Sequence, residues 1–193
     1  HVISRCIEKR LLLKKSIVKK IFLVIVKKAQ ERYDFELNYY CIMDNHFHMI
    51  IRIVYNGDSL DKIMQYIKSN FARMYNKYTC RTGPFWNERY KTKIIEKYSN
   101  PEKYLLNTLL YLTINPVKAN NVTSPFYYKY SSFLYYINNK VKLIVKITLH
   151  PFFLKLGKSI KECTNCFIDL FNYYKEKYIA HNWKLIYDFN YRN

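Results

Sequence analysis

The sequence lacks any apolar run long enough to cross a membrane. Near its start the longest uninterrupted apolar stretch is residues 21–26, whereas a helix that spans a bilayer needs about 20 apolar residues. No segment has the pattern of a secretory signal peptide. The five cysteines are an odd number without secretory context, which argues against a disulfide framework. We therefore expect a reduced, cytoplasmic protein with no membrane partner.

Acidic residues are scarce as well, because 14 Asp and Glu stand against 33 Lys and Arg, for a formal net charge of +19. A bias of this size over the whole length points to a polyanionic partner. The basic residues are interleaved with 21 tyrosines and 12 phenylalanines, and this mixture suits phosphates and exposed bases better than a membrane surface. Glycine is rare, at 3 residues, so part of the tyrosine excess can reflect a compositional bias of the genome.

The order of the predicted elements indicates an α+β fold. Apolar periodicity predicts strand 1–5, helix 13–32, strands 35–42 and 46–54, helix 60–78, strand 85–95 and helix 99–114. The first six match the βαββαβ order of a ferredoxin-like sandwich, a four-stranded antiparallel sheet with helices on one face. The seventh element is an added helix that could lie across the sheet. Residues 125–133 are expected to wrap the core, and residues 158–178 to form a last helix.

The third predicted strand carries two histidines, His46 and His48. Residues two apart on a strand point to the same side, so both imidazoles can bind one divalent cation. Phe47 and Met49 would then face the core. For a lone His-x-His the simpler interpretation is a pair of histidines on a solvated strand face.

The added helix places Tyr111 and Asn115 one turn apart on one side, where both can face a common site. An Asn before Pro116 is also a plain stop signal for a helix. In the fourth predicted strand, alternation would put Arg89 together with its neighbours Lys91 and Lys93 on one face. That pattern suits a track for single-stranded nucleic acid, and it equally suits an edge strand protected by lysines.

Other polar residues receive structural interpretations. The lysines of helix 13–32 are expected on a solvated face. A lone Cys-x-x-Cys pair at Cys163 is weak as a zinc site, and Cys163 lies on an apolar stripe. His150 and His181 have no partners at ligand spacing.

Three motifs occur in order: residues 43–48 (MDNHFH), residues 81–91 (RTGPFWNERYK) and residues 111–119 (YLTINPVKA). With HVISR at the start, they resemble the REP-associated tyrosine transposases, in the IS200-like single-tyrosine group of the HUH endonuclease superfamily. The resemblance covers about residues 1–135. Cys6 stands where that family usually has Gly, and Asp44 where it often has Pro. Neither departure removes a reacting group.

The resemblance implies a metal-dependent endonuclease and strand transferase that acts in DNA transposition and recombination. His46, His48 and Asn115 would bind Mg²⁺ or Mn²⁺. Tyr111 would attack the scissile phosphate and leave a 5′-phosphotyrosine link with a free 3′-OH. The partner would be single-stranded DNA with a REP-like or element-end hairpin, bound by a monomer or homodimer that is associated with the nucleoid. The candidates for DNA contact are Arg5, Arg81, Trp86, Arg89, Lys91, Lys93 and Lys118.

We expect residues 1–135 to form the transposase domain and residues 136–193 a C-terminal extension of unassigned role. Two other functions stay open. One is a non-catalytic protein of the same fold that binds hairpin or single-stranded DNA. The other is a metal-dependent hydrolase that activates water without a covalent step. A trapped protein–DNA adduct distinguishes the transposase from both.

Overall fold

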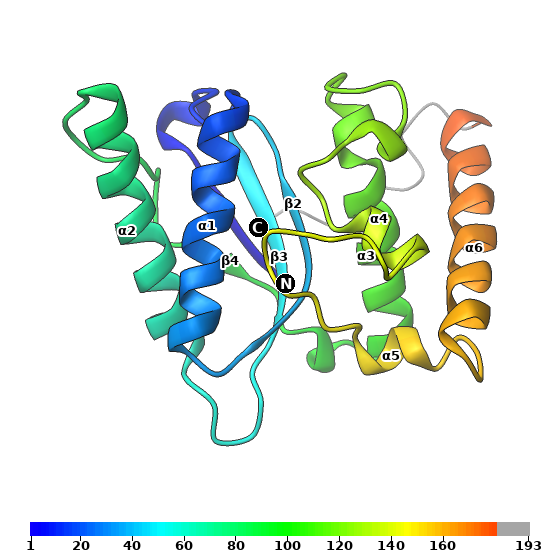
Figure 1. Ribbon diagram of the computed structural model, residues 1–193. Helices are drawn as coiled ribbons and strands as arrows, with labels where there is room; N and C mark the ends of the chain where they lie inside the picture. Colours follow the sequence, from blue (N-terminus) through cyan, green and yellow to red (C-terminus); the bar gives the residue numbers. More distant parts are fainter. Residues whose placement is uncertain (181–193) are drawn as a thin grey trace.

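The computed structural model describes residues 1–180, with side chains up to residue 176. Its centre is a four-stranded antiparallel sheet in the order β2-β3-β1-β4. The strands are β1 Val2–Arg5, β2 Glu36–Ile42, β3 His46–Arg52 and β4 Lys91–Thr92. The longer helices of this part are α1 Ser16–Arg32, α2 Leu60–Thr79 and α3 Pro101–Lys118. Helices α1 and α2 lie on one face of the sheet and α3 on the other (Figure 1). The predicted α+β, ferredoxin-like fold is confirmed, with the added helix across the sheet.

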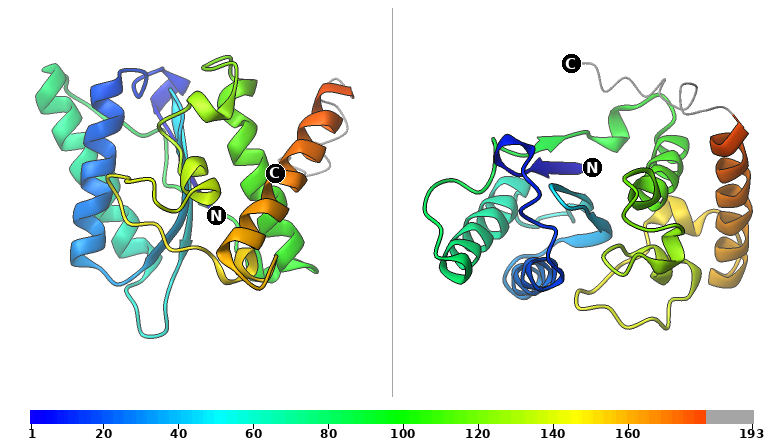
Figure 2. Two further views of the ribbon diagram at one scale, coloured as in Figure 1. Left: turned by 45° about the vertical axis from the view of Figure 1, so that its right-hand side comes forward. Right: turned by 90° about the horizontal axis from the view of Figure 1, so that it is seen from above.

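Strand β3 explains this two-sided arrangement. Phe47 and Met49 are fully buried and point to the α1–α2 side, where the rings of Phe22 and Phe47 lie 4.7 Å apart between centroids. His46 and His48 alternate with them and point to α3. Seen from above, the sheet stands between the two helical layers (Figure 2). The apolar side of β3 therefore holds the core, and its polar side is left for a site.

Strand β4 is much shorter than predicted. The prediction of a strand over residues 85–95 was wrong for most of these residues. Phe85 is buried against α2. The indole Nε1 of Trp86 donates to the carbonyl oxygen of Lys68, also on α2, at 3.0 Å. Both rings turn toward α2, while their backbone keeps a single antiparallel bridge, Trp86 to Cys6, and accepts from the Ile7 N–H at the Phe85 carbonyl oxygen at 2.9 Å. The regular strand β4 is confined to Lys91–Thr92.

Two helix ends also differ from the prediction. Helix α1 begins at Ser16 rather than at Leu13, because the Leu13 N–H donates to the carbonyl oxygen of Asp44 at 2.9 Å. Helix α3 continues through Pro116 to Lys118 instead of ending at residue 114. Proline lacks an N–H, yet the N–H groups of residues 119–121 bond back to carbonyls of residues 115–117 and close the helix.

The residues after α3 cover the outer edge of β2. The Ile42 N–H donates to the Tyr130 carbonyl oxygen at 2.9 Å, and the Ser132 N–H to that of Tyr40 at 3.0 Å. An edge that could pair with another chain is thereby occupied. The prediction that residues 125–133 wrap the core is confirmed.

The remaining elements are α4 Phe133–Ile137, α5 Pro151–Leu154, α6 Ile160–Ala180 and the 3-10 turns η1 Ile7–Lys9, η2 Ile95–Lys97 and η3 Pro125–Tyr127. Helices α5 and α6 pack against α3, and α6 agrees with the last predicted helix. The division after residue 135 stays a prediction. None of the helices in residues 1–180 has the length and apolar character that crossing a membrane requires.

Candidate active site

The site is built from the polar side of β3 and the facing side of α3. The rings of His46 and His48 lie 4.9 Å apart between centroids. The Tyr111 ring meets His48 edge-on at 6.2 Å, and the Asn115 amide nitrogen lies 3.2 Å from His48 Nε2. The structure therefore brings together all four residues that the sequence predicted for the catalytic centre.

His48 sits in a chain of hydrogen bonds that fixes its tautomer. Because the Asn115 amide N–H donates to Nε2 of His48, the proton of this imidazole is on Nδ1. That Nδ1–H donates to Nε2 of His1 at 3.0 Å. His1 is 6% exposed and stacks on His48 with ring centroids 5.2 Å apart. No pattern in the sequence predicts this contact, since it joins residues far apart in the chain.

His46 is held in the same way by its neighbour. The Asn45 Oδ1 accepts from His46 Nδ1 at 2.6 Å, while the Asn45 amide nitrogen donates to the Lys9 carbonyl oxygen at 3.1 Å. That second bond fixes which end of the amide faces the imidazole. Both histidines are thus Nδ1–H tautomers with an unprotonated Nε2, the arrangement that outer partners impose on metal ligands. The Nε2 of His48 accepts from the Asn115 amide in this structure, and a bound metal ion would take the place of that hydrogen bond.

Burial also keeps both imidazoles neutral. It lowers the pKa of His46 to about 4, with the Arg5 charge adding to the effect and the Asp44 charge opposing it. It lowers the pKa of His48 well below the usual value, with the charges of His46 and Arg5 adding to the effect. Neutral imidazoles are the form that binds a metal ion.

These shifts predict a pH dependence of stability for the metal-free protein. At pH values below 6.5, the ordinary histidine pKa, His46 is protonated in the unfolded chain. In the folded protein it stays neutral until about pH 4. The free energy of unfolding is therefore highest above pH 6.5 and falls as the pH drops toward 4. His46→Asn should remove about 3 kcal/mol of this loss, measured by urea unfolding at several pH values. Equal losses in the wild type and the variant would contradict the assignment.

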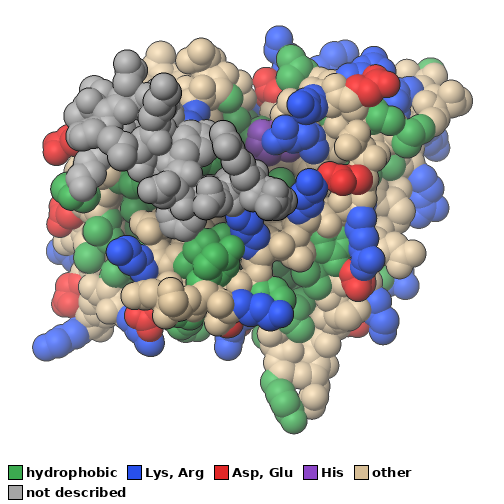
Figure 3. Space-filling model, turned by 180° about the vertical axis from the view of Figure 1, so that it is seen from behind, with side chains coloured by type: hydrophobic (Ala, Val, Ile, Leu, Met, Phe, Trp, Pro, Cys, Tyr) green, Lys and Arg blue, Asp and Glu red, His purple; other side chains and the backbone are tan. Residues whose placement is uncertain are grey.

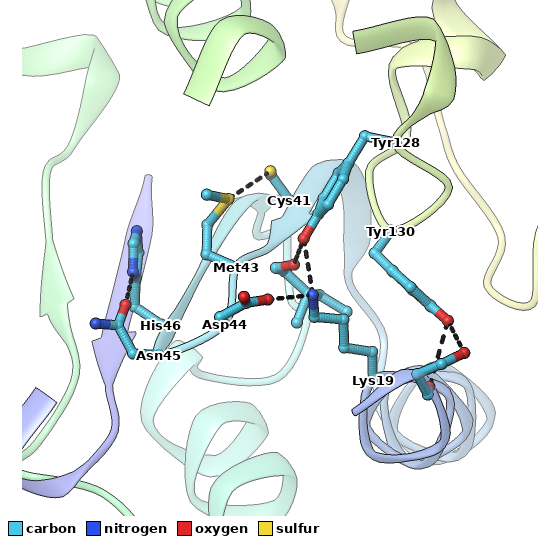
Figure 4. A network of polar contacts seen from close by, with 10 residues as sticks. Lys19, Cys41, Met43, Asp44, Asn45, His46, Tyr128 and Tyr130 are labelled. Atoms are coloured by element: carbon cyan, nitrogen blue, oxygen red, sulfur yellow. Dashed lines mark hydrogen bonds and ion pairs between the residues drawn. The ribbon is translucent and has the colours of Figure 1, made fainter. Parts of the chain in front are cut away.

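A buried lysine holds the turn that precedes His46 (Figure 4). Lys19 of α1 is 3% exposed. Its Nζ lies 2.6 Å from an Asp44 carboxylate oxygen and 3.0 Å from the Tyr128 hydroxyl. Tyr128 in turn donates to the Ile42 carbonyl oxygen at 2.5 Å, and the Tyr130 ring lies under the ammonium at 5.1 Å. The expectation of a solvated face for the lysines of this helix was wrong for Lys19, which falls one turn before the buried Phe22.

The donor set fits a hard or borderline divalent cation. Within residues 1–180 no group of three His, Cys, Asp or Glu side chains is gathered for a metal ion. A third protein ligand to such an ion would come from another kind of side chain. Asn115 is 8% exposed, and its amide lies beside His48 Nε2 with the nitrogen toward the imidazole. With the amide turned over, its oxygen would be a ligand that Mg²⁺ and Mn²⁺ accept.

Cationic residues share the histidine side of the sheet. Arg5 pairs with His46 across the β1–β3 ladder, and Lys91 pairs with Ile3 on the other side of β1. Residues that pair directly in an antiparallel ladder point to one face, so Arg5 and Lys91 lie on the face of His46. The Lys93 N–H donates to the His1 carbonyl oxygen at 2.9 Å. Figure 3 shows Lys and Arg side chains beside a histidine that reaches the surface on the side of the molecule drawn there.

The other predicted DNA contacts lie elsewhere. Arg89 turns to α2, where its guanidinium bonds to the Asp61 carboxylate, so it does not share a face with Lys91 as alternation had suggested. Arg81 bonds to Asn76 at the end of α2. Trp86 is half-buried among phenylalanine rings.

Lys118 and His150 complete the predicted set. The Lys118 Nζ lies over the Tyr111 ring, 5.2 Å from its centroid, and so belongs to the active-site side of α3. His150 caps α5, because its Nδ1 accepts from the Phe152 N–H at 3.1 Å, in agreement with a structural role. Cys163 is buried and packs, as predicted. His181 lies outside the described residues.

This fold and this site define a class of protein. A family model described as "Transposase IS200 like" matches residues 1–107, and the chain belongs to that family. The matched residues include His46 and His48 and end just before Tyr111.

Two individual proteins are similar to the chain. A curated protein of Haemophilus influenzae, named as a REP-associated tyrosine transposase, is 29% identical over 116 residues, which cover 55% of this chain and 64% of that protein. The chain thus spans less than two thirds of that relative. A solved structure of a REP-associated tyrosine transposase bound to a REP hairpin matches with a TM-score of 0.59 at 19% identity, over 76% of this chain and 83% of that one. The resemblance stated from the motifs is thereby confirmed.

Proposed function

We propose that this protein is a metal-dependent single-stranded DNA endonuclease and strand transferase that works through a covalent tyrosine intermediate. The observation that carries the proposal is the meeting of Tyr111 and Asn115 on α3 with His46 and His48 on β3. A helix and a strand from separate parts of the chain supply one nucleophile and a set of neutral metal donors. The family membership supports the same reaction class.

The chemistry follows from these groups. A Mg²⁺ or Mn²⁺ ion held by His46, His48 and Asn115 would polarise the scissile phosphate and offset its developing charge. The Tyr111 oxygen attacks phosphorus, a new P–O bond forms, and the bond from phosphorus to the 3′ oxygen breaks. The tyrosine proton is lost to solvent or a base, and the departing 3′ oxygen gains one. A second 3′-OH reverses the step, so joining needs no nucleotide cofactor.

The surroundings of the site suit a DNA strand. Arg5, Lys91 and Lys93 place positive charge along the sheet on the histidine side, and Lys118 places another next to Tyr111. Phosphate contacts of this kind position a nucleic acid and make its binding depend on salt. We propose DNA with a hairpin and an unpaired flank as the substrate, by likeness to the solved relative.

The hydrogen bond from His46 to Asn45 gives a test of the metal site. Asn45→Ala removes the acceptor that fixes the His46 tautomer, and loss of such an outer partner weakens metal binding by about 10- to 100-fold. Asn45→Asp keeps an acceptor oxygen and should bind Mn²⁺ more tightly than Asn45→Ala. Titration calorimetry with Mn²⁺ measures both, with His150→Asn as a control at a histidine that caps α5. Equal affinities for Asn45→Ala and the wild type would contradict the role of His46 as a ligand.

The proposed reaction is tested with hairpin oligonucleotides taken from the flanks of the native gene. Cleavage in Mn²⁺ that is abolished by chelation and by His48→Asn is the expected result. Binding without cleavage, across several metals and flanking sequences, would indicate a DNA-binding protein without catalysis. Cleavage without a covalent adduct would indicate a hydrolase.

A further inference from the structure

A surface pocket of about 510 Å³ lies between α2 and the segment that leads into β4. Its apolar wall includes Met64, Phe85 and Trp86, and Tyr90 adds a third aromatic side chain beside them. Trp86 is fixed by its bond to the Lys68 carbonyl oxygen. The pocket thus offers ring surface that is already ordered, and ordered rings are the usual platform for stacking an unpaired base.

A carboxylate at the rim of the pocket can bond to the polar edge of a base. Asp61 accepts hydrogen bonds from Arg89 and from the Tyr90 hydroxyl. These bonds keep the pKa of Asp61 low, so it stays ionised. Its carboxylate would repel a phosphate but can accept from the amino edge of a base.

Lys68 is held against the Trp86 ring. Its Nζ donates to the Glu88 carbonyl oxygen at 2.6 Å and lies over that ring at 5.5 Å. Burial lowers its pKa to about 8, so it keeps most of its charge at neutral pH. The pocket therefore joins apolar ring walls to one carboxylate, Asp61, and two cations, Lys68 and Arg89, of which Arg89 is bonded to Asp61. Rings with hydrogen-bonding groups at their rim are a suitable surround for a base.

The pocket lies at the β4 edge of the sheet on its α2 side, whereas the histidines lie on the opposite face. Asn87, next to Trp86, donates its N–H to the Arg5 carbonyl oxygen at 3.0 Å, and Arg5 pairs with His46. At the other end of the segment, Tyr90 directly precedes Lys91 of β4. A DNA strand that runs along Arg5 and Lys91 would therefore have to cross the β4 edge to place a base in the pocket.

We infer that this pocket receives one unpaired nucleobase of the bound DNA, turned out of the strand as it passes the β4 edge. The inference rests on the proposed function in that it takes single-stranded DNA as the ligand. It adds a second point of recognition, away from the reacting phosphate, that can set which position of the unpaired flank is held.

The test measures binding in the Tyr111→Phe background, which removes cleavage. Hairpin oligonucleotides are made with one abasic site at each unpaired position in turn, and affinity is read by fluorescence anisotropy. Ser69→Trp fills the pocket from an exposed position of α2 that lines it, and Ser69→Ala is the matched control. Neither change alters charge. Ala72→Phe is a second filling variant, and thermal unfolding verifies that each variant is folded.

We expect one abasic position to weaken binding by about tenfold in the parent and in Ser69→Ala, as loss of a stacked base does. Ser69→Trp should bind the intact oligonucleotide more weakly than the parent does, by the same factor. In this variant an abasic site at that position should weaken binding no further. The salt dependence should be unchanged, since no phosphate contact is removed. A Ser69→Trp variant that binds as the parent does, or equal losses at every abasic position, would overturn the inference.

A smaller salt dependence in Ser69→Trp would show a phosphate in the pocket and would also overturn the inference. These results are separable from the proposed function, because cleavage by the wild type is scored without reference to the pocket. If the parent bound no hairpin oligonucleotide, both proposals would fail.

Discussion

Tyr111→Phe should abolish formation of the covalent protein–DNA adduct while leaving DNA binding intact. The variant removes one oxygen, the proposed nucleophile, and keeps the ring that meets His48 edge-on at 6.2 Å and lies under Lys118. Loss of an enzyme nucleophile lowers the rate on the order of 10⁴-fold or more. The measurement is adduct formation on a denaturing gel, with anisotropy for affinity on the same oligonucleotide.

A neighbouring tyrosine provides the control for this experiment. Tyr104 lies two turns earlier on α3 and is buried against Tyr98, so Tyr104→Phe should form adduct at close to the wild-type rate. Adduct at the wild-type rate in Tyr111→Phe would show that the nucleophile is elsewhere. Loss of DNA binding together with the adduct would show that Tyr111 positions DNA and would leave its role as nucleophile unsupported.

The second large effect is expected at Lys19. Lys19→Met removes the cation that Asp44 and two tyrosine rings surround. Breaking a buried ion pair by removing one partner costs about 3–5 kcal/mol, because it leaves an uncompensated charge. The free energy of unfolding should fall by about that amount, measured by urea unfolding at neutral pH. Since the pair holds the turn before His46, Mn²⁺ affinity should fall as well.

Lys20 is the matched control, because it is the next residue of α1 and is exposed. Lys20→Met should change stability by within about 0.5 kcal/mol, as most surface substitutions do. Adding Asp44→Asn to Lys19→Met should recover part of the loss, because the orphaned carboxylate is then neutral. Similar losses for the Lys19 and Lys20 variants would contradict a structural role for the buried pair.

Local spacing was enough to predict which residues of the candidate site share a face, while their proposed roles came from the family resemblance. His46 and His48 share a face because they are two residues apart on a strand, and Tyr111 and Asn115 share one because they are a turn apart on a helix. The element order placed this helix across the sheet, and the structure confirms it. These features depend on short-range patterns and on the order of the elements. A sequence contains the information needed to predict both of these properties.

Long-range packing decided the features that the sequence did not reveal. The stack of His1 on His48 joins residues 47 positions apart. The regular part of the predicted fourth strand is limited to Lys91–Thr92, and Trp86, whose ring turns to α2, keeps only an isolated bridge to Cys6. Lys19 is a partial exception, since its position one turn before Phe22 put it on the buried stripe and Asp44 was available as a counter-charge.

The most direct test of the proposed reaction is to identify which fragment of the cut DNA becomes attached to the protein. A hairpin oligonucleotide is labelled at its 5′ end in one sample and at its 3′ end in another, incubated with the wild type and Mn²⁺, and run on a denaturing gel. A 5′-phosphotyrosine link predicts that the 3′-labelled fragment migrates with the protein, and that peptide mapping finds the nucleotide on Tyr111. Attachment of the 5′-labelled fragment, attachment at another residue, or complete cleavage with no attached fragment would contradict it.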